Sequence, residues 1–474
     1  MTNSSPRLLT PNCHEVWLYQ LGYLGYALDI IDGLPGRYCN KWDTRMRPVP
    51  RGANLVSLDE VLQSRPHYDC IITHSITDLL DLKTLPGPRI LVIHETLDGR
   101  IRQHGLPMSP DQLRLLVQHY LDLVGGHAMA VSDLKATSWR FVDDIVRNCI
   151  DVREYPPWSG EVKAGLRISN QVSKRKEILL WDFYEAAFGD MNVRLVGFNP
   201  DMPGVIPSRD WTDLKSILSS HRFFIHTAHP ELEDGYNNAT LEAMSAGLPV
   251  LGNKNPSSPV EHGVSGFLSD DPAELRRYAR LLLQDKELAG RMGEAARKKV
   301  ADRFPVEGFV GGFNRSIQAA EKKWQMRRLS DDYFSLTISG RNEKRQLLAR
   351  SGHFLRLSDC FQHQVESMDI EGAIGILDEI MKDLDMPRYE CISNFEELIN
   401  IVLDVSCWLR ESQERRAEES LLKAALILAA IEKETDKEKE REKQGTPSVF
   451  PVPVSVSSQF LWRRDRAPVS QPAY

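Results

Sequence analysis

The stretch that decides the fold is Glu233-Asp-Gly-Tyr-Asn-Asn-Ala-Thr-Leu-Glu-Ala-Met-Ser-Ala-Gly-Leu-Pro-Val250. A loop containing one glycine precedes a helical pattern, which a Gly-Leu-Pro turn and the start of a strand follow. Backbone N–H groups at the beginning of a helix, with the positive end of its dipole, suit a phosphate-bearing ligand. Two acids, Asp234 and Glu242, bracket that beginning. On spacing alone they are weak indicators of a site, because Asp234 could cap a helix and Glu242 could lie on its surface.

Short apolar segments alternate with helical patterns on both sides of this stretch. They are Arg89–Ile93, His127–Val131, Val193–Gly197 and Phe223–His226. This alternation predicts parallel sheets with crossover helices. Because the segments are apolar throughout, and not at every second residue, both faces of each sheet should be covered. Pro-Pro and Gly interrupt the pattern within residues 152–160, which predicts a linker between two α/β domains.

The expected organisation has five parts. Residues 1–155 form a first Rossmann-like, doubly wound domain and residues 156–310 a second, with a cleft between them. A closing helix at 311–330 and an all-α region at 331–445 follow, the latter because apolar residues recur at helical spacing, as at Ile374, Leu377 and Ile380. Residues 446–474 are rich in Pro, Ser and Val and are expected to be disordered.

The composition excludes several classes of protein. Apolar residues make up 42% and charged residues 26% of the 474, which is ordinary for a folded globular chain. A formal charge of −7 argues against nucleic acid as a partner. The longest aliphatic run, Ala424–Ile431, is far shorter than the about 20 residues of a membrane-spanning helix. Met1–Pro11 does not have the pattern of a signal peptide, so we expect a cytoplasmic location.

The cysteines and acids suggest no bound metal or other cofactor. The seven cysteines include no Cys-x-x-Cys pair, so neither a disulfide framework nor a zinc cage is expected. Cys13 has no evident base partner and is interpreted as a packing residue. The pair Asp383-Leu-Asp385 falls in the predicted all-α region, away from the acids at 234 and 242.

These phrases together resemble the C-terminal, donor-binding domain of family 4 retaining glycosyltransferases, which have the GT-B fold. The family signature is Glu-x7-Glu followed by Ala-Met-small-Ala-Gly-x-Pro-Val, and Asp234, Glu242 and residues 243–250 match it here. Residues 261–268 are similar to the family's Glu-x4-Gly-x-Leu. Weaker matches precede them in the same order as in the family, at Val131-Ser-Asp133, Asn148-Cys-Ile-Asp151 and Leu195-Val-Gly-Phe-Asn-Pro200.

The resemblance implies transfer of a sugar from a nucleotide-sugar donor to an unknown acceptor, with retention of anomeric configuration and without a metal. It also implies that Asp234 contacts the donor sugar and that Glu242 holds the ribose. The backbone amides of Gly235, Tyr236 and Asn237 would approach the sugar and the diphosphate. Aspartate in place of the family's first glutamate shortens the reach by one methylene, so the donor sugar sits differently or differs in kind.

A second motif of the family, Gly-Arg-x4-Lys-Gly, stabilises the leaving group and corresponds to Ile168–Lys176. Gln171 stands where the family has arginine, Lys176 stands at the lysine, and Arg175 is the expected substitute for the arginine. Positive charge is needed because the departing nucleotide diphosphate gains charge in the transition state. A solvated basic turn is the alternative interpretation. Gly197, in the stretch after the next strand, is expected beside the donor.

Four residues of the first domain are candidates for the acceptor side. His94 follows the strand Arg89–Ile93, and a side chain just past the carboxyl end of a parallel strand faces the ligand crevice. The family commonly has a histidine there that touches the sugar or the acceptor. His74 ends an equivalent strand. The family's Gly-Gly loop after the first strand is missing, and Asn12 and His14 are expected to take its place.

Two other functions remain open. A catalytically inactive GT-B scaffold could hold a protein partner through the all-α region, and the departures at Gln171 and Asp234 favour it. A nucleotide-sugar epimerase with the same fold is the third possibility.

Overall fold

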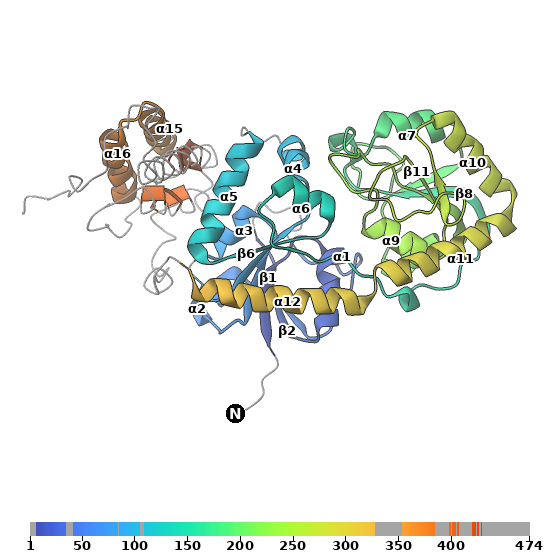
Figure 1. Cartoon of the computed structure of the whole chain (residues 1–474), viewed down its shortest axis with the longest axis horizontal. Coiled ribbons are helices and arrows are strands. Elements are labelled where there is room, and N and C mark those ends of the chain that lie inside the picture. The colour runs from blue at the N-terminus through green and yellow to red at the C-terminus, as the bar shows by residue number, and fades with distance from the viewer. Residues whose placement is uncertain are drawn as a thin grey trace, which may run out of the picture. The chain divides into compact units, whose positions relative to one another are not determined.

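The computed structural model describes residues 6–34, 41–83, 85–104, 109–327 and 353–383, with isolated helical residues between 398 and 428. The chain divides into two compact units. Met1–Pro110 and Tyr120–Ser335 form the first unit, and Asp111–His119 and Leu336–Tyr474 form the second. Both sheets belong to the first unit (Figure 1).

The first sheet has seven parallel strands in the order β3-β2-β1-β4-β5-β6-β7. The chain winds outward from β1 to β3, then begins β4 on the other side of β1. The strands β5 and β6 are buried at every position, as expected for a sheet covered on both faces. The strands are β1 (Arg7–Pro11), β2 (Ala27–Ile31), β3 (Ala53–Val56), β4 (Cys70–Thr73), β5 (Arg89–Ile93), β6 (His127–Ala130) and β7 (Asp144–Ile145).

The second sheet has five parallel strands in the order β12-β11-β10-β8-β9. They are β8 (Val162–Ile168), β9 (Val193–Val196), β10 (His221–Ile225), β11 (Val250–Gly252) and β12 (Gly266–Leu268). The winding direction reverses between β1 and β4 in the first sheet and between β8 and β10 in the second. Loops beyond the carboxyl ends of the strands at these reversals are where open α/β sheets bind ligands. The two doubly wound parallel sheets predicted from the sequence are confirmed.

Helices connect the strands, and several begin at side-chain caps that the sequence supplies. Ser57, Ser132, Asp210, Asn237 and Asp271 each accept a hydrogen bond from a backbone N–H of the helix that they precede. The α-helices are α1 (Glu15–Leu18), α2 (Leu58–Ser64), α3 (Ile76–Asp81), α4 (Leu97–His104), α5 (Pro110–Val124), α6 (Asp133–Trp139), α7 (Trp181–Phe188), α8 (Trp211–Ser220), α9 (Asn238–Ser245), α10 (Pro272–Gln284) and α11 (Lys286–Arg303). Short 3-10 helices are η1 (Tyr19–Leu24), η2 (Val152–Glu154) and η3 (Val172–Lys174).

A long helix after the second sheet packs against the first sheet. This helix, α12 (Val306–Gln325), lies along that sheet in Figure 1, and Phe309 and Phe313 enter its hydrophobic core. It begins five residues before the helix expected at 311, because burial against the sheet outweighs the low helix propensity of the glycines near its start. One of these, Gly312, allows close approach, since a Cβ there would lie 3.2 Å from the Val146 side chain.

The described part of the second unit contains a helix pair within the region predicted to be all-α. The helices α15 (His353–Glu366) and α16 (Ile370–Asp383) pack against each other, and Phe361, Val365 and Leu377 are buried. The expectations for residues 331–352, 384–397 and 446–474 fall outside the described residues. Within the described part of the chain, none of the helices combines the length and the apolar character needed to cross a membrane.

Candidate functional site

A buried lysine joins the two sheets of the first unit. Lys135 lies in the first turns of α6, and its Nζ donates hydrogen bonds to Glu233 Oε1 (2.9 Å) and Asp234 Oδ2 (2.8 Å), in the loop before α9. Burial alone would lower the pKa of Lys135, but the two carboxylates raise it above its ordinary value. The ammonium therefore stays charged between two acids.

Asp234 keeps one carboxylate oxygen for a further contact. Its Oδ2 accepts from Lys135, whereas its Oδ1 is buried with no hydrogen-bond partner among the described residues. His226, just after β10, lies with Nε2 3.1 Å from the Asp234 carbonyl oxygen. Burial lowers the pKa of His226 to about 4, so its neutral ring donates this hydrogen bond. A buried carboxylate oxygen without a partner suits a hydroxyl group of a ligand.

Glu242, the second acid of the pair, also contacts a cation from the side of the first sheet. Glu242, on α9, forms an ion pair with Arg47, and the two side chains are only 4% and 2% exposed. The guanidinium of Arg47 also lies over the Trp211 ring, 4.7 Å from its centroid. Trp42 holds the turn by donating from Nε1 to the Arg47 carbonyl oxygen. The carboxylate expected to hold a ribose is thus paired with an arginine in this structure.

The loop that opens α9 is tightly fixed. Asn237 caps the helix, and its own N–H donates to Thr240 Oγ1. The Gly235 N–H donates to Ser257 Oγ, and a Cβ at Gly235 would lie 2.7 Å from the Ser258 nitrogen. The Tyr236 ring packs in the core beside Phe304. Two of the three amides expected to face a sugar diphosphate, those of Gly235 and Asn237, therefore already donate to hydroxyl groups of the protein.

Of the residues in the second basic motif, only Arg175 joins the charge cluster within the described residues. Its Nη2 lies 3.5 Å from Glu233 Oε2, and its buried Nε has no partner there. Lys176 is exposed, and Gln171 adopts a left-handed conformation (φ 50°) before η3. Gly197 has a positive φ of 142°, and a Cβ there would lie 2.2 Å from the Ser169 carbonyl oxygen. Gly197 thus permits a close approach of two loops.

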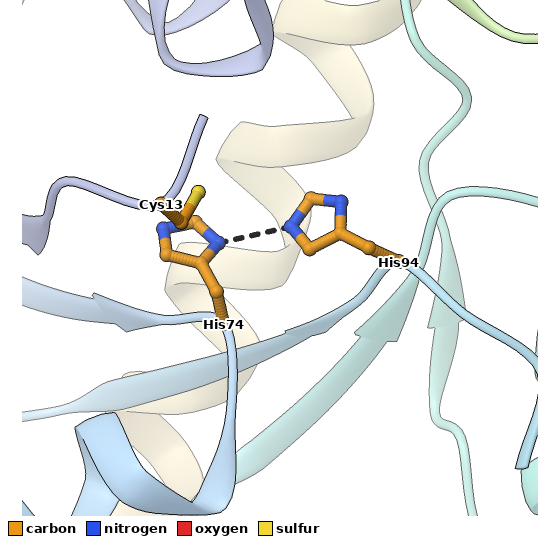
Figure 2. A group of neighbouring side chains, drawn as sticks. All are labelled: Cys13, His74 and His94. Carbon is orange, nitrogen blue, oxygen red and sulfur yellow. Dashed lines mark hydrogen bonds between the residues drawn. The ribbon is translucent and has the colours of Figure 1, made fainter. Parts of the chain in front are cut away.

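The four first-domain candidates gather beyond the ends of β1, β4 and β5. His74 Nδ1 lies 3.0 Å from His94 Nε2, as Figure 2 shows. Asn12 donates from Nδ2 to Asp32, and its Oδ1 is buried without a partner among the described residues. Burial, together with the charges of two nearby arginines, Arg47 and Arg175, lowers the pKa of His14 to about 4.

The histidines belong to the same electrostatic neighbourhood as the acids. Burial is the first cause that holds the pKa of His94 well below its usual value, and the charges of His74, Lys135 and His14 add to it. The tertiary structure therefore brings His14, His94, Arg175 and the acids Asp234 and Glu242 around two cations that no motif had indicated, Arg47 and Lys135. Lys135 had one indirect signal, its place just after the Val131-Ser-Asp133 match. Arg47 had none.

Direct hydrogen bonds tie the start of α9 and the loop before it to the first sheet's side. Asn148 donates from Nδ2 to Oδ1 of Asn238, the first residue of α9, and accepts from Trp17 Nε1. Thr96 donates from Oγ1 to the Leu232 carbonyl oxygen (2.8 Å). The loop that carries Asp234 is therefore held against the carboxyl ends of the first sheet's strands.

Residues 199–299 match the model of the family described as Glycosyl transferases group 1. This segment contains both Asp234 and Glu242. The O-antigen chain mannosyltransferase B of Escherichia coli is 23% identical over 248 residues, which are 51% of this chain and 59% of the relative. The N-acetyl-alpha-D-glucosaminyl L-malate synthase of Bacillus anthracis is 33% identical over 85 residues, 17% of this chain and 22% of the relative. The chain thus spans less than two thirds of either relative.

Among solved structures, HepE of Anabaena in complex with UDP and glucose is similar with a TM-score of 0.50 and 16% sequence identity. The similarity covers 66% of this chain and 99% of HepE. The structure of the same protein with UDP-glucose gives the same TM-score at 15% identity. These likenesses show the fold, so the predicted GT-B architecture is confirmed. Together with the family model, they support a glycosyltransferase.

Proposed function

We propose that this protein transfers a sugar from a nucleotide-sugar donor to an acceptor with retention of configuration. One observation carries the proposal: Asp234 and Glu242, spaced as the family's acid pair, flank the start of α9 and both face buried cations from the first sheet's side. A site that binds a nucleotide diphosphate and releases it as a leaving group needs both carboxylates and cations. Carboxylates hold hydroxyl groups, and cations hold phosphates.

The cations supply the charge that the departing diphosphate requires. Lys135 contacts Glu233 and Asp234, while Arg175 contacts Glu233 and Arg47 contacts Glu242. A leaving nucleotide diphosphate gains negative charge, and preorganised cations in a buried site stabilise it without further reorganisation. Arg175 and Arg47 would replace the arginine that is missing at Gln171. With three cations present, transfer as we propose it uses no metal ion.

Donor binding would exchange the partners of Glu242. In the proposed complex the ribose hydroxyls donate to Glu242, and the Arg47 guanidinium turns from that carboxylate to the diphosphate. The unpartnered Asp234 Oδ1 accepts from a sugar hydroxyl. As the resemblance to the family implies, leaving-group departure and acceptor attack would occur on the same face. The acceptor would approach from the side of Asn12, His14, His74 and His94.

Nucleotide binding tests the proposal before any acceptor is known. The melting temperature is measured with UDP, GDP and ADP, since a ligand that binds only the native state must raise it. One of them should stabilise the wild type, and Glu242→Gln should lose that shift. Glu261→Gln is the matched control, because Glu261 belongs to the same matched segment but is exposed and paired with Lys299. The nucleotide sugars of the stabilising base are then assayed for transfer and for slow donor hydrolysis.

A catalytically inactive scaffold is the second candidate, and the Arg47–Glu242 ion pair favours it because that pair occupies the carboxylate needed for ribose. A scaffold of this kind would act by holding a protein partner. The same experiment separates the two functions. A folded wild type that neither binds any nucleotide nor hydrolyses any nucleotide sugar contradicts the transferase and supports the scaffold.

A further inference from the structure

Three side chains with metal-binding atoms converge at the switch point of the first sheet. Cys13 lies just beyond β1, His74 directly follows β4 and His94 directly follows β5, and these three strands are neighbours. One ligand atom of each lies within 4.8 Å of the others. Figure 2 shows the two imidazole rings facing each other, with Cys13 beside His74. The carboxyl ends of adjacent strands thus hold the group on a rigid frame.

Both ring nitrogens of His74 lie at hydrogen-bond distance from a neighbouring side chain. His74 Nε2 lies 2.8 Å from Thr10 Oγ1. His74 Nδ1 lies 3.0 Å from His94 Nε2. In the tautomer that carries its hydrogen on Nε2, His74 donates to Thr10 and keeps at Nδ1 the lone pair that a metal ion needs. A metal-binding histidine usually coordinates the ion through one ring nitrogen and donates a hydrogen bond from the other, which fixes the orientation of the ring.

Packing fixes both rings in place. The Trp17 ring meets the edge of His74 with centroids 5.1 Å apart and that of His94 with centroids 4.9 Å apart. Trp17 is itself buried in the core of the first sheet. The rings therefore need little ordering when a ligand binds, and ordering is a main cost of assembling a metal site.

We propose that Cys13, His74 and His94 form a binding site for one zinc ion. One thiolate with two imidazoles is a ligand set that suits Zn²⁺, and three protein ligands leave a fourth position for water or an external ligand. Tetrahedral zinc with these ligands places their donor atoms roughly 3.3–3.8 Å apart. Side-chain rotations that move the donor atoms by up to about one ångström bring the present cluster to that geometry.

Zinc binding changes the protons of the cluster in a defined way. With zinc bound, each imidazole is neutral and carries its hydrogen on the ring nitrogen that does not hold the metal. The Cys13 thiol loses its proton to solvent, because the thiolate is the ligand. Each zinc ion therefore releases about one proton, and its affinity weakens in acid. The inference does not rest on the proposed sugar transfer, which uses no metal. The sequence predicted no metal site, because these three ligands lie at the ends of separate strands and show no metal-binding spacing along the chain.

The experiment titrates Zn²⁺ into the full chain, after chelator treatment and with a phosphine reductant, in competition with a chromophoric chelator. We expect one zinc ion per chain and release of about one proton per ion. Cys13→Ser and His74→Gln should each weaken the affinity by at least about 100-fold, and Thr10→Val by about 10- to 100-fold through loss of the hydrogen bond to His74. Cys360→Ser is the control, because Cys360 is an exposed free thiol in α15.

A second measurement needs no variant. Co²⁺ bound in place of zinc should show a thiolate-to-cobalt charge-transfer band together with the visible bands of a tetrahedral ion. Absence of that band in the wild type overturns the proposal. So does an affinity that is unchanged in Cys13→Ser, or one that is lost in Cys360→Ser. Matching melting temperatures of the variants and the wild type in chelator show that folding is not the cause of the loss.

Discussion

Lys135 and Asp234 form a buried ion pair between a helix that follows the first sheet's sixth strand and a loop that precedes α9, with Nζ 2.8 Å from Oδ2. The side chains are 7% and 2% exposed. Glu233 is the second acid on the same ammonium. Burying such an ion pair costs desolvation energy. Removing one of its two partners leaves the other as an uncompensated buried charge.

Replacing Lys135 should therefore destabilise the fold. Lys135→Met leaves Asp234 without its cation and Glu233 with only the longer contact to Arg175. Breaking one side of a buried pair costs about 3–5 kcal/mol. Chemical denaturation measures the free energy of unfolding. Lys174→Met, at an exposed lysine, is the control and should change it by less than about 0.5 kcal/mol. If both variants lost a similar unfolding free energy, the Lys135–Asp234 ion pair would make no specific contribution to stability.

The Arg47–Glu242 pair should show strong coupling in a double-mutant cycle. Each of Arg47→Met and Glu242→Gln removes one partner of a buried pair, whereas the double variant removes both. The double variant should cost less than the sum of the single ones by about 1–3 kcal/mol. The exposed pair Lys299–Glu261 provides the comparison, with an expected coupling of about 0–1 kcal/mol. Additive losses at Arg47 and Glu242 would argue against a direct interaction.

His226 should make the protein sensitive to mild acid. Burial lowers the pKa of His226 from 6.5 to about 4, so between these values the unfolded chain binds a proton that the folded one does not. Its contribution to stability is complete above pH 6.5 and falls progressively as the pH drops towards 4, by roughly 3 kcal/mol in all. Unfolding free energies measured from pH 7.5 to 4 check this.

The matched variants for this pH dependence are His226→Gln and His67→Gln. Glutamine at position 226 keeps an N–H donor but cannot be protonated, so the pH dependence should become shallower by the share of His226. Other histidines whose pKa values are also lowered, such as His14 and His94, keep the rest. His67 is 85% exposed, and its replacement should leave the slope as it is. A slope that is unchanged in His226→Gln would assign the acid sensitivity to other groups.

Gly197 should not tolerate a side chain. Alanine there combines a positive φ of 142° with a Cβ only 2.2 Å from the Ser169 carbonyl oxygen. We expect Gly197→Ala to lower the unfolding free energy by more than about 2 kcal/mol. Gly204→Ala is the control, since Gly204 also has a positive φ (83°) but has open space around it. It should cost about 1 kcal/mol. Equal losses would show that the backbone conformation alone decides the cost.

Arg175 should affect transfer more than stability. Its guanidinium reaches the Glu233 carboxylate at only 3.5 Å and is partly exposed, so Arg175→Met should leave the melting temperature nearly unchanged. As a stabiliser of the leaving group, it should lower kcat by about 10²–10³. Lys174→Met, next to it, should leave kcat unchanged. A KM effect with an unaltered kcat would assign Arg175 to ground-state binding only.

Much of the fold could be predicted because local patterns encode it. The run Arg89–Ile93 is continuously apolar apart from its first residue, and it became a central strand with the same bounds. The helix at 306–325 was only partly predictable. Its glycines weaken the local helical signal, and its stability comes from Phe309 and Phe313 in the core of a sheet formed by residues far away in the sequence.

The sequence by itself determined two doubly wound parallel sheets and the position of Asp234 and Glu242 around a helix start, because both depend on periodicity and short-range spacing. Only the tertiary structure decided which charges face those acids, since Arg47 and Lys135 reach them across 195 and 99 residues of chain. The same holds for Cys13, His74 and His94. Adjacent parallel strands bring distant segments to one edge of a sheet, and no spacing rule in the linear sequence records that neighbourhood.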